Sequence, residues 1–212
     1  IMSIVCPTVT CQSEDLHEYR RQMERVEFAE RIQIDLMDGI FTPTKSPDVS
    51  DIWVFEDKTI DIHLMFMNPS DVLNDVLDLK PNLVIIHAEA DVHIPTFSGA
   101  LKNEGIKFGL ALLKETNPTE ILDHLPYIDH VLIFSGDLGK FGGDLDPSLL
   151  RKVSQLKQVK PELEIGWDGG VNDTNINLLA SGGIDVINVG GYIQNAENPQ
   201  ENYQKLVNLL QS

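Results

Sequence analysis

Eight short apolar runs alternate with amphipathic stretches along the chain, and this alternation is the feature that most constrains its fold. Strands that alternate with helices indicate parallel pairing, because each helix carries the chain back to the start of the next strand. Eight such units close into a (β/α)8 TIM barrel. The expected strands span residues 3–5, 32–36, 59–66, 83–87, 107–112, 130–134, 163–167 and 185–189.

The segments between these strands carry helix signals. Ser13 is expected to be the N-cap of the first helix, since Glu14 and Asp15 follow it in the first turn, where the helix dipole favours acids. Further helical segments are expected near residues 49–55, from 69, over 96–102, from 117, from 147 and through 203–210. An open doubly wound sheet is the alternative, but the glycine-rich turn that often follows its first strand is missing. We therefore expect one barrel domain over residues 1–212.

The charge balance argues against several kinds of partner. Acidic residues outnumber basic ones 33 to 16, which gives a formal net charge of −17. This charge makes nucleic acid and an anionic membrane surface poor partners, so an anionic substrate must be held by local donors. The two cysteines, Cys6 and Cys11, form neither a disulfide framework nor a zinc motif. Without an apolar run of membrane-spanning length or a signal peptide, a cytoplasmic protein is the default expectation.

Three polar residues are predicted to meet at the mouth of the barrel, where the strands end. In the stretch 32–39, apolar residues alternate with Gln33 and Asp35, so Asp35 shares a face with Gln33 and Met37. Asp168 ends the seventh strand, and His63 lies on the third. Two opposed carboxylates suit the transfer of a proton from one face of a carbon to the other.

Each of these residues also has a purely structural interpretation. Asp35 could bond its own loop backbone, and Asp168 could be a turn residue before two glycines. His63 could be a metal ligand, an electrophile or a core histidine. The position of all three at strand ends is what favours a functional site.

Glycines cluster after the last three strands and predict a phosphate site. The last loops of a barrel often bind phosphate through backbone amides, and glycine lets the backbone approach the anion closely. Tight turns alone could explain any one glycine pair, but three in succession favour the phosphate site. The residues concerned are Gly139, Gly142, Gly143, Gly169, Gly170, Gly190 and Gly191.

Taken together, these segments resemble the ribulose-phosphate 3-epimerase family over nearly the whole chain. The fold implied is a barrel of the ribulose-phosphate-binding type. The matching motifs, in chain order, are Pro7-Thr8, Ile34-Asp35-Leu36-Met37-Asp38-Gly39, Asp61-Ile62-His63-Leu64-Met65, Asn68-Pro69, His87-Ala88-Glu89-Ala90, Phe141-Gly142-Gly143, Trp167-Asp168-Gly169-Gly170 and Gly190-Gly191.

The resemblance implies a role for most of these residues. Asp35 and Asp168 would be the acid–base pair that inverts C3 of a ketose phosphate through an enediolate. A divalent metal, commonly zinc in the family, would be held by Asp35, His63, Asp168 and the residue at position 33. Thr8, His63, Met37 and Met65 would contact the substrate, together with the glycine pairs at 142–143, 169–170 and 190–191. A homo-oligomer is also expected.

The sequence departs from the family pattern at several site positions. Gln33 stands where the family has a second histidine ligand, and an amide oxygen is a poorer zinc ligand than imidazole. A weakly held metal, a different metal and no metal therefore stay open. Phe134 replaces a pocket methionine, Asp144 replaces a glutamine, and the loop 135–141 lacks the family's Glu-Pro-Gly lead.

The candidate functions for such a chain belong to three classes: epimerase, non-catalytic binder, and lyase or decarboxylase. Epimerisation of ribulose 5-phosphate and xylulose 5-phosphate is expected first, and of a hexulose 6-phosphate second. The alternatives are a non-catalytic sugar-phosphate-binding barrel and a lyase or decarboxylase. The decarboxylases of this superfamily usually carry an Asp-x-Lys-x-x-Asp pattern, and neither site strand supplies its lysine.

Overall fold

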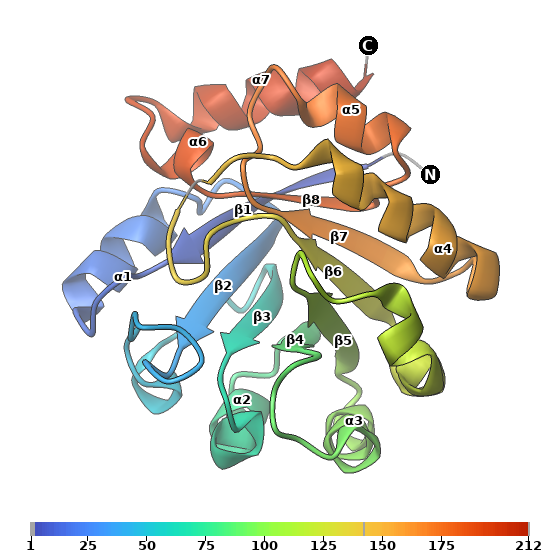
Figure 1. Cartoon of the computed structure of the whole chain (residues 1–212). Coiled ribbons are helices and arrows are strands. Elements are labelled where there is room, and N and C mark those ends of the chain that lie inside the picture. The colour runs from blue at the N-terminus through green and yellow to red at the C-terminus, as the bar shows by residue number, and fades with distance from the viewer. Residues whose placement is uncertain (1–2, 142, 212) are drawn as a thin grey trace.

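The computed structural model describes residues 3–141 and 143–211 and shows a closed barrel of eight parallel strands, in the order β1 to β8 (Figure 1). Helices surround the barrel, as the sequence predicted. The strands are β1 Ile4–Thr10, β2 Arg31–Met37, β3 Thr59–Met65, β4 Leu83–His87, β5 Lys107–Leu112, β6 His130–Phe134, β7 Glu164–Asp168 and β8 Val186–Val189. The α-helices are α1 Leu16–Glu24, α2 Leu73–Asp78, α3 Ile94–Asn103, α4 Arg151–Val159, α5 Ile176–Ser181, α6 Gly191–Gln194 and α7 Pro199–Gln211. The 3-10 helices are η1 Val49–Asp51, η2 Pro69–Val72, η3 Pro118–Tyr127 and η4 Pro147–Leu150.

The expected helix boundaries needed correction in three places. The N-cap of α1 is Asp15 rather than Ser13, because the Asp15 carboxylate accepts a hydrogen bond from the His17 amide at 2.9 Å. The helix expected at 49–55 is only the short η1. The segment after Asn117 has the predicted start, with a capping box to Glu120, but it is a 3-10 helix that contains Pro126.

Strand alternation divides the apolar residues into two packed layers. β4 is buried at every position, as expected for a strand covered on both faces. Its Leu83 and Ile85 form a small cluster with Ala111 and Leu132, separate from the main core. Side chains of the opposite parity, such as Ile86, belong to the large cluster between strands and helices. The barrel is therefore a filled core whose inward positions at the strand ends are free to carry polar groups.

A buried ionic network closes the end of the barrel where the strands begin. Arg31 donates to Asp61 at 2.6 Å and to both carboxylate oxygens of Glu164, at 2.9 and 3.1 Å. Asn82 donates to the second oxygen of Asp61 at 3.0 Å. The side chain of Asp61 is 2% exposed, so its charge depends on these partners.

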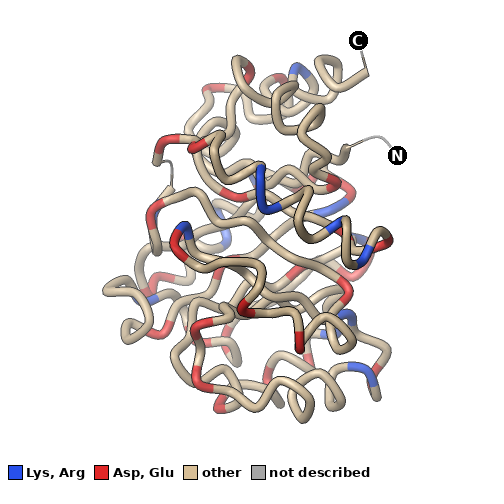
Figure 2. Tube along the Cα trace, turned by 45° about the vertical axis from the view of Figure 1, so that its right-hand side comes forward, with Lys and Arg blue, Asp and Glu red and all other residues tan. Residues whose placement is uncertain are grey.

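Acidic residues are the more numerous of the charged residues in the structure, as they are in the sequence. Acidic positions outnumber basic ones along the backbone trace (Figure 2), consistent with the net charge of −17. Among the described residues, no helix has both the length and the apolar character needed to cross a membrane.

Replacing Arg31 with Met should lower the free energy of unfolding by about 3–5 kcal/mol, because Asp61 would keep a buried charge without its partner. Urea denaturation measures this loss. Arg20→Met, at an exposed arginine, is the matched control and should change stability by about 0.5 kcal/mol or less. A loss below about 1 kcal/mol at Arg31, the size of an exposed ion pair, would show that the network does not hold the barrel end together.

Candidate active site

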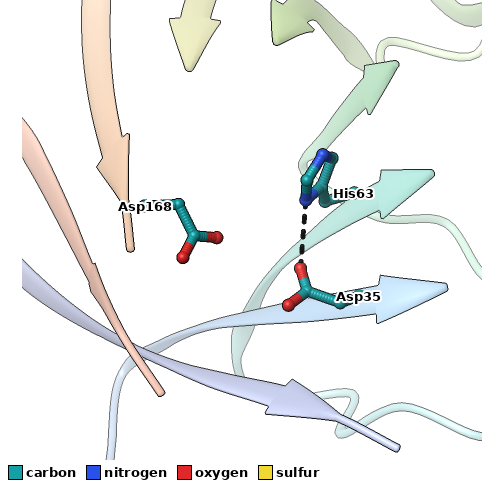
Figure 3. A group of neighbouring side chains, drawn as sticks. All are labelled: Asp35, His63 and Asp168. Carbon is teal, nitrogen blue, oxygen red and sulfur yellow. Dashed lines mark hydrogen bonds and ion pairs between the residues drawn. The ribbon is translucent and has the colours of Figure 1, made fainter. Parts of the chain in front are cut away.

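Three side chains, one each from β2, β3 and β7, meet at the mouth of the barrel. The parallel register of β2 and β3 places Asp35 beside His63, and Asp168 ends β7 across the barrel. Figure 3 shows the Asp168 carboxylate directed toward the other two residues. The ligand atoms of all three lie within 4.8 Å of one another. The structure thus brings together the three residues that the sequence predicted to meet.

Asp35 is held by three side chains at once. The Thr10 hydroxyl donates to its Oδ2 at 2.6 Å, and the Gln33 amide donates to its Oδ1 at 2.9 Å. Nδ1 of His63 lies 3.1 Å from the same Oδ1. The residue is 6% exposed, so these contacts replace the water that the carboxylate lost on folding.

Gln33 links the two carboxylates across the barrel. Its Nε2 also donates to Oδ2 of Asp168, at 2.6 Å. Burial first, and the nearby Asp35 carboxylate second, raise the pKa of Asp168 to about 7. Two carboxylates this close do not readily ionise together, so one proton or a cation stabilises the pair. Asp168 therefore tends to hold a proton near neutral pH.

A second histidine, His87, contacts His63. Nε2 of His63 lies 3.0 Å from Nε2 of His87, which ends β4. Nδ1 of His87 lies 3.5 Å from the Glu89 carboxylate. Burial lowers the pKa of His87 to about 4, so this imidazole is neutral at physiological pH. Phe41 packs on the His87 ring with centroids 4.7 Å apart.

The residues at the mouth fit a divalent cation. Asp35, His63 and Asp168 offer the oxygen and nitrogen ligands that zinc binds. Oε1 of Gln33 is buried and has no hydrogen-bond partner among the described residues. A half-turn of the amide would exchange its nitrogen and oxygen and point that oxygen at the carboxylates, an arrangement that a cation between them would favour.

A cavity of about 330 Å³ opens beside these groups and is lined by most of the residues expected to bind substrate. Met37 and His63 are buried and are not among its lining residues, and Gly142 lies outside the described part of the chain. The expected residues that line it are Thr8, Asp35, Met65, Gly139, Gly143, Asp168, Gly169, Gly170, Gly190 and Gly191.

Two of the glycines lie where the structure leaves no room for a side chain. Gly169 has φ +112°, and a Cβ there would lie 2.0 Å from the Gly136 nitrogen. A Cβ on Gly190 would lie 2.7 Å from both the Phe141 ring and the Thr8 hydroxyl. Side chains at these positions would displace the loops after β6 and β7 or fill the cavity.

Sequence reasoning missed several polar residues of the site. Thr10 shares the inward face of β1 with Thr8, and His87 is the inward residue at the end of β4, so strand alternation could have identified both. The cavity residues on loops gave no periodic signal. They include Gly136, Lys140 and Asn172, while Tyr192 lies in the short α6 and Asn195 caps its end.

Comparisons with known proteins agree with this arrangement. The family model described as the ribulose-phosphate 3 epimerase family matches residues 6–194. A ribulose-phosphate 3-epimerase of Helicobacter pylori is 33% identical, over 94% of this chain and 95% of that protein. One of Treponema pallidum is 30% identical, over 75% of this chain and 76% of that protein.

Solved structures confirm the fold. A structure titled KGPDC from Streptococcus mutans aligns with a TM-score of 0.78 at 13% identity, covering 100% of this chain and 98% of that one. A 3-hexulose-6-phosphate synthase from Salmonella typhimurium aligns with a TM-score of 0.74 at 16% identity, covering 98% of each chain. The extent of the sequence matches, over a barrel that holds the expected site residues together, shows that the chain belongs to the ribulose-phosphate 3-epimerase family.

Proposed function

We propose that this protein inverts C3 of a phosphorylated ketose and interconverts ribulose 5-phosphate and xylulose 5-phosphate. The observation that carries the proposal is the pair of carboxylates from β2 and β7, which share one amide donor at the mouth of the barrel. Inversion needs a base on one face of the carbon and an acid on the other, and β2 and β7 lie three strands apart around the barrel, so their carboxylates reach the mouth from different sides.

Asp35 and Asp168 divide the proton transfers between them. Asp168, with a pKa raised to about 7, holds the proton that it delivers to C3. Asp35 removes the C3 proton from the opposite face, and the Thr10 hydroxyl and Gln33 amide hold its carboxylate in place. In the reverse direction the two residues exchange roles. The resulting enediolate carries negative charge, and hydrogen-bond donors fixed at the mouth of the barrel would stabilise that charge.

A divalent cation, with zinc as the first choice, would be held by Asp35, His63 and Asp168, with the oxygen of Gln33 completing the set. When bound, it would stabilise charge on the enediolate oxygens as a Lewis acid. With its nitrogen toward the carboxylates, the Gln33 amide donates to both of them, whereas its oxygen can only accept and would face them through the cation.

Local donors along the last loops support binding of the substrate phosphate. Gly190 and Gly191 begin α6 at the cavity, where free backbone amides point outward. Lys140 lines the same cavity and supplies a positive charge in a chain that is strongly acidic overall. Thr8 lines the same cavity, and its hydroxyl lies close to Gly190.

Asp35→Asn should lower the rate of epimerisation at least about 10³-fold, because an amide cannot accept the C3 proton. The conversion of ribulose 5-phosphate to xylulose 5-phosphate measures the rate, and calorimetry measures binding of the sugar phosphate. Binding should change by less than tenfold. A variant with full activity would contradict the mechanism, and a wild type that binds the sugar phosphate without converting it would make the protein a non-catalytic binder.

Gln33→His should tighten zinc binding by tenfold or more, because imidazole is a better zinc ligand than an amide. Competition with a fluorescent chelator gives both affinities. Gln33→Leu, which removes the ligand and both hydrogen bonds, is the comparison and should bind zinc more weakly than the wild type. Equal affinity in all three proteins would exclude position 33 from the metal site.

Asp168→Asn should abolish a pH dependence of stability in the metal-free protein. The folded-state pKa of Asp168 lies above its unfolded value, so the group stabilises the fold at low pH and this contribution is lost as pH rises through about 7. Between about pH 4 and 7, the wild type should lose up to about 1.4 kcal/mol per pH unit relative to Asp168→Asn. Urea denaturation at several pH values measures the difference. Parallel curves for the two proteins would contradict the raised pKa.

A further inference from the structure

Asn188 is a buried amide at the cavity that the proposed proton transfers do not use. It lies on β8, is 2% exposed and lines the cavity beside the two carboxylates. Its Oδ1 is buried and has no hydrogen-bond partner among the described residues. A carbonyl oxygen is costly to bury without a donor, so this atom is a candidate to accept a hydrogen bond from a ligand in the cavity.

The strands on either side of β8 do not supply a donor to this oxygen. β8 lies between β7 and β1 (Figure 1), and the register places Asp168 and Cys6 beside Asn188. The Asp168 carboxylate accepts a hydrogen bond from the Gln33 amide, and the Cys6 thiol is directed at the carbonyl of Pro7. The amide of Asn188 is therefore available to substrate.

Asn188 lies between the two ends of the cavity that would anchor the proposed substrate. Asp168, its neighbour in the register, is at the end where C3 would react. Gly190 lines the cavity at the end where the phosphate would bind, and it follows two residues later, about 6.6 Å further along an extended chain. In a ketose 5-phosphate, C4 separates the reacting C3 from the C5 that carries the phosphate. The C4 hydroxyl is therefore the substrate group that would lie nearest to Asn188.

We propose that Asn188 binds the C4 hydroxyl of the ketose phosphate and selects its configuration. The hydroxyl donates its proton to Oδ1 of the amide, which pairs the buried oxygen. Inversion at C4 turns the hydroxyl away from β8 and leaves that oxygen unpaired, so the protein discriminates against the C4 epimer. This inference rests on the proposed function, because it uses the placement of C3 and of the phosphate proposed there.

The alternative is that Asn188 acts within the protein alone, by supporting Asp168 or by filling space beside Cys6. Its replacement would then affect substrates with and without a C4 hydroxyl to the same extent. A direct contact instead makes the effect of the replacement depend on that hydroxyl. The two interpretations are therefore separated by changing the residue and the substrate together.

The test combines one variant with one substrate analogue and measures kcat/KM. Asn188→Leu removes the amide at nearly constant side-chain volume, and 4-deoxyribulose 5-phosphate removes the hydroxyl. Each change alone should lower kcat/KM about 10- to 100-fold, because it leaves a buried polar group unpaired. The two changes together should cost little more than either one. Losses that multiply would overturn the proposal.

Matched controls address the ligand and the protein. 1-Deoxyribulose 5-phosphate lacks a hydroxyl on the side of C3 away from the phosphate, so its loss in rate should be the same with Asn188 and with leucine. A loss that depended on residue 188 would overturn the assignment to C4. Asn103→Leu, the same change at an exposed asparagine that ends α3, should leave every rate unchanged. Asn188→Ala repeats the measurement if circular dichroism shows that leucine disturbs the fold.

The C4 epimer tests the selection of configuration. L-Xylulose 5-phosphate differs from D-ribulose 5-phosphate only at C4. We expect the wild type to prefer D-ribulose 5-phosphate about 10- to 100-fold in kcat/KM, and Asn188→Leu to lose most of this preference. A preference that the substitution leaves unchanged would contradict the role of Asn188.

Calorimetry in an Asp35→Asn background repeats the comparison for binding without turnover. The dependence of the amide effect on the C4 hydroxyl should appear there in Kd. A wild type that does not convert D-ribulose 5-phosphate, but whose Asp35→Asn form shows this dependence in Kd, would contradict the proposed function and support this inference. Conversion of the ketose without the dependence would do the reverse, and a protein that binds no ketose phosphate would contradict both.

Discussion

The site depends on one electrostatic constraint, which is that two largely buried carboxylates lie close together at the base of the cavity. Asp35 and Asp168 share the Gln33 amide, and burial with mutual repulsion raises the pKa of Asp168 to about 7. A pair of this kind is stable only with a proton, a cation or both between its members. The proposed inversion at C3 uses this constraint, because it leaves Asp168 holding a proton near neutral pH.

The barrel satisfies this constraint through strand geometry. Inward side chains alternate with outward ones, so the apolar residues of β2 pack beneath the helices while Gln33 and Asp35 face the interior. Parallel register then sets His63 beside Asp35, and closure of the barrel brings Asp168 from the far side. At the opposite end, Arg31 neutralises buried acids in the same way that a cation would at the mouth.

Much of this could be predicted from the sequence because strand periodicity is a local signal. The expected strands at 83–87, 107–112 and 130–134 have the same bounds in the structure, and the barrel class was confirmed. Helix ends were less accurate, since Asp15 competes with Ser13 for the N-cap and Pro126 favours a 3-10 helix after Asn117. The triad of Asp35, His63 and Asp168 followed from strand ends alone. The sequence did not predict the bridging amide of Gln33 or the contact between His63 and His87, because both depend on side-chain rotamers across the barrel.

In the proposed reaction, C3 of the sugar phosphate exchanges its proton with the two carboxylates. The most direct measurement is proton NMR of ribulose 5-phosphate incubated with the protein in deuterium oxide, with metal content determined on the same sample. We expect deuterium at C3 together with the appearance of xylulose 5-phosphate. A sugar phosphate that binds but keeps its C3 proton and its configuration would contradict it.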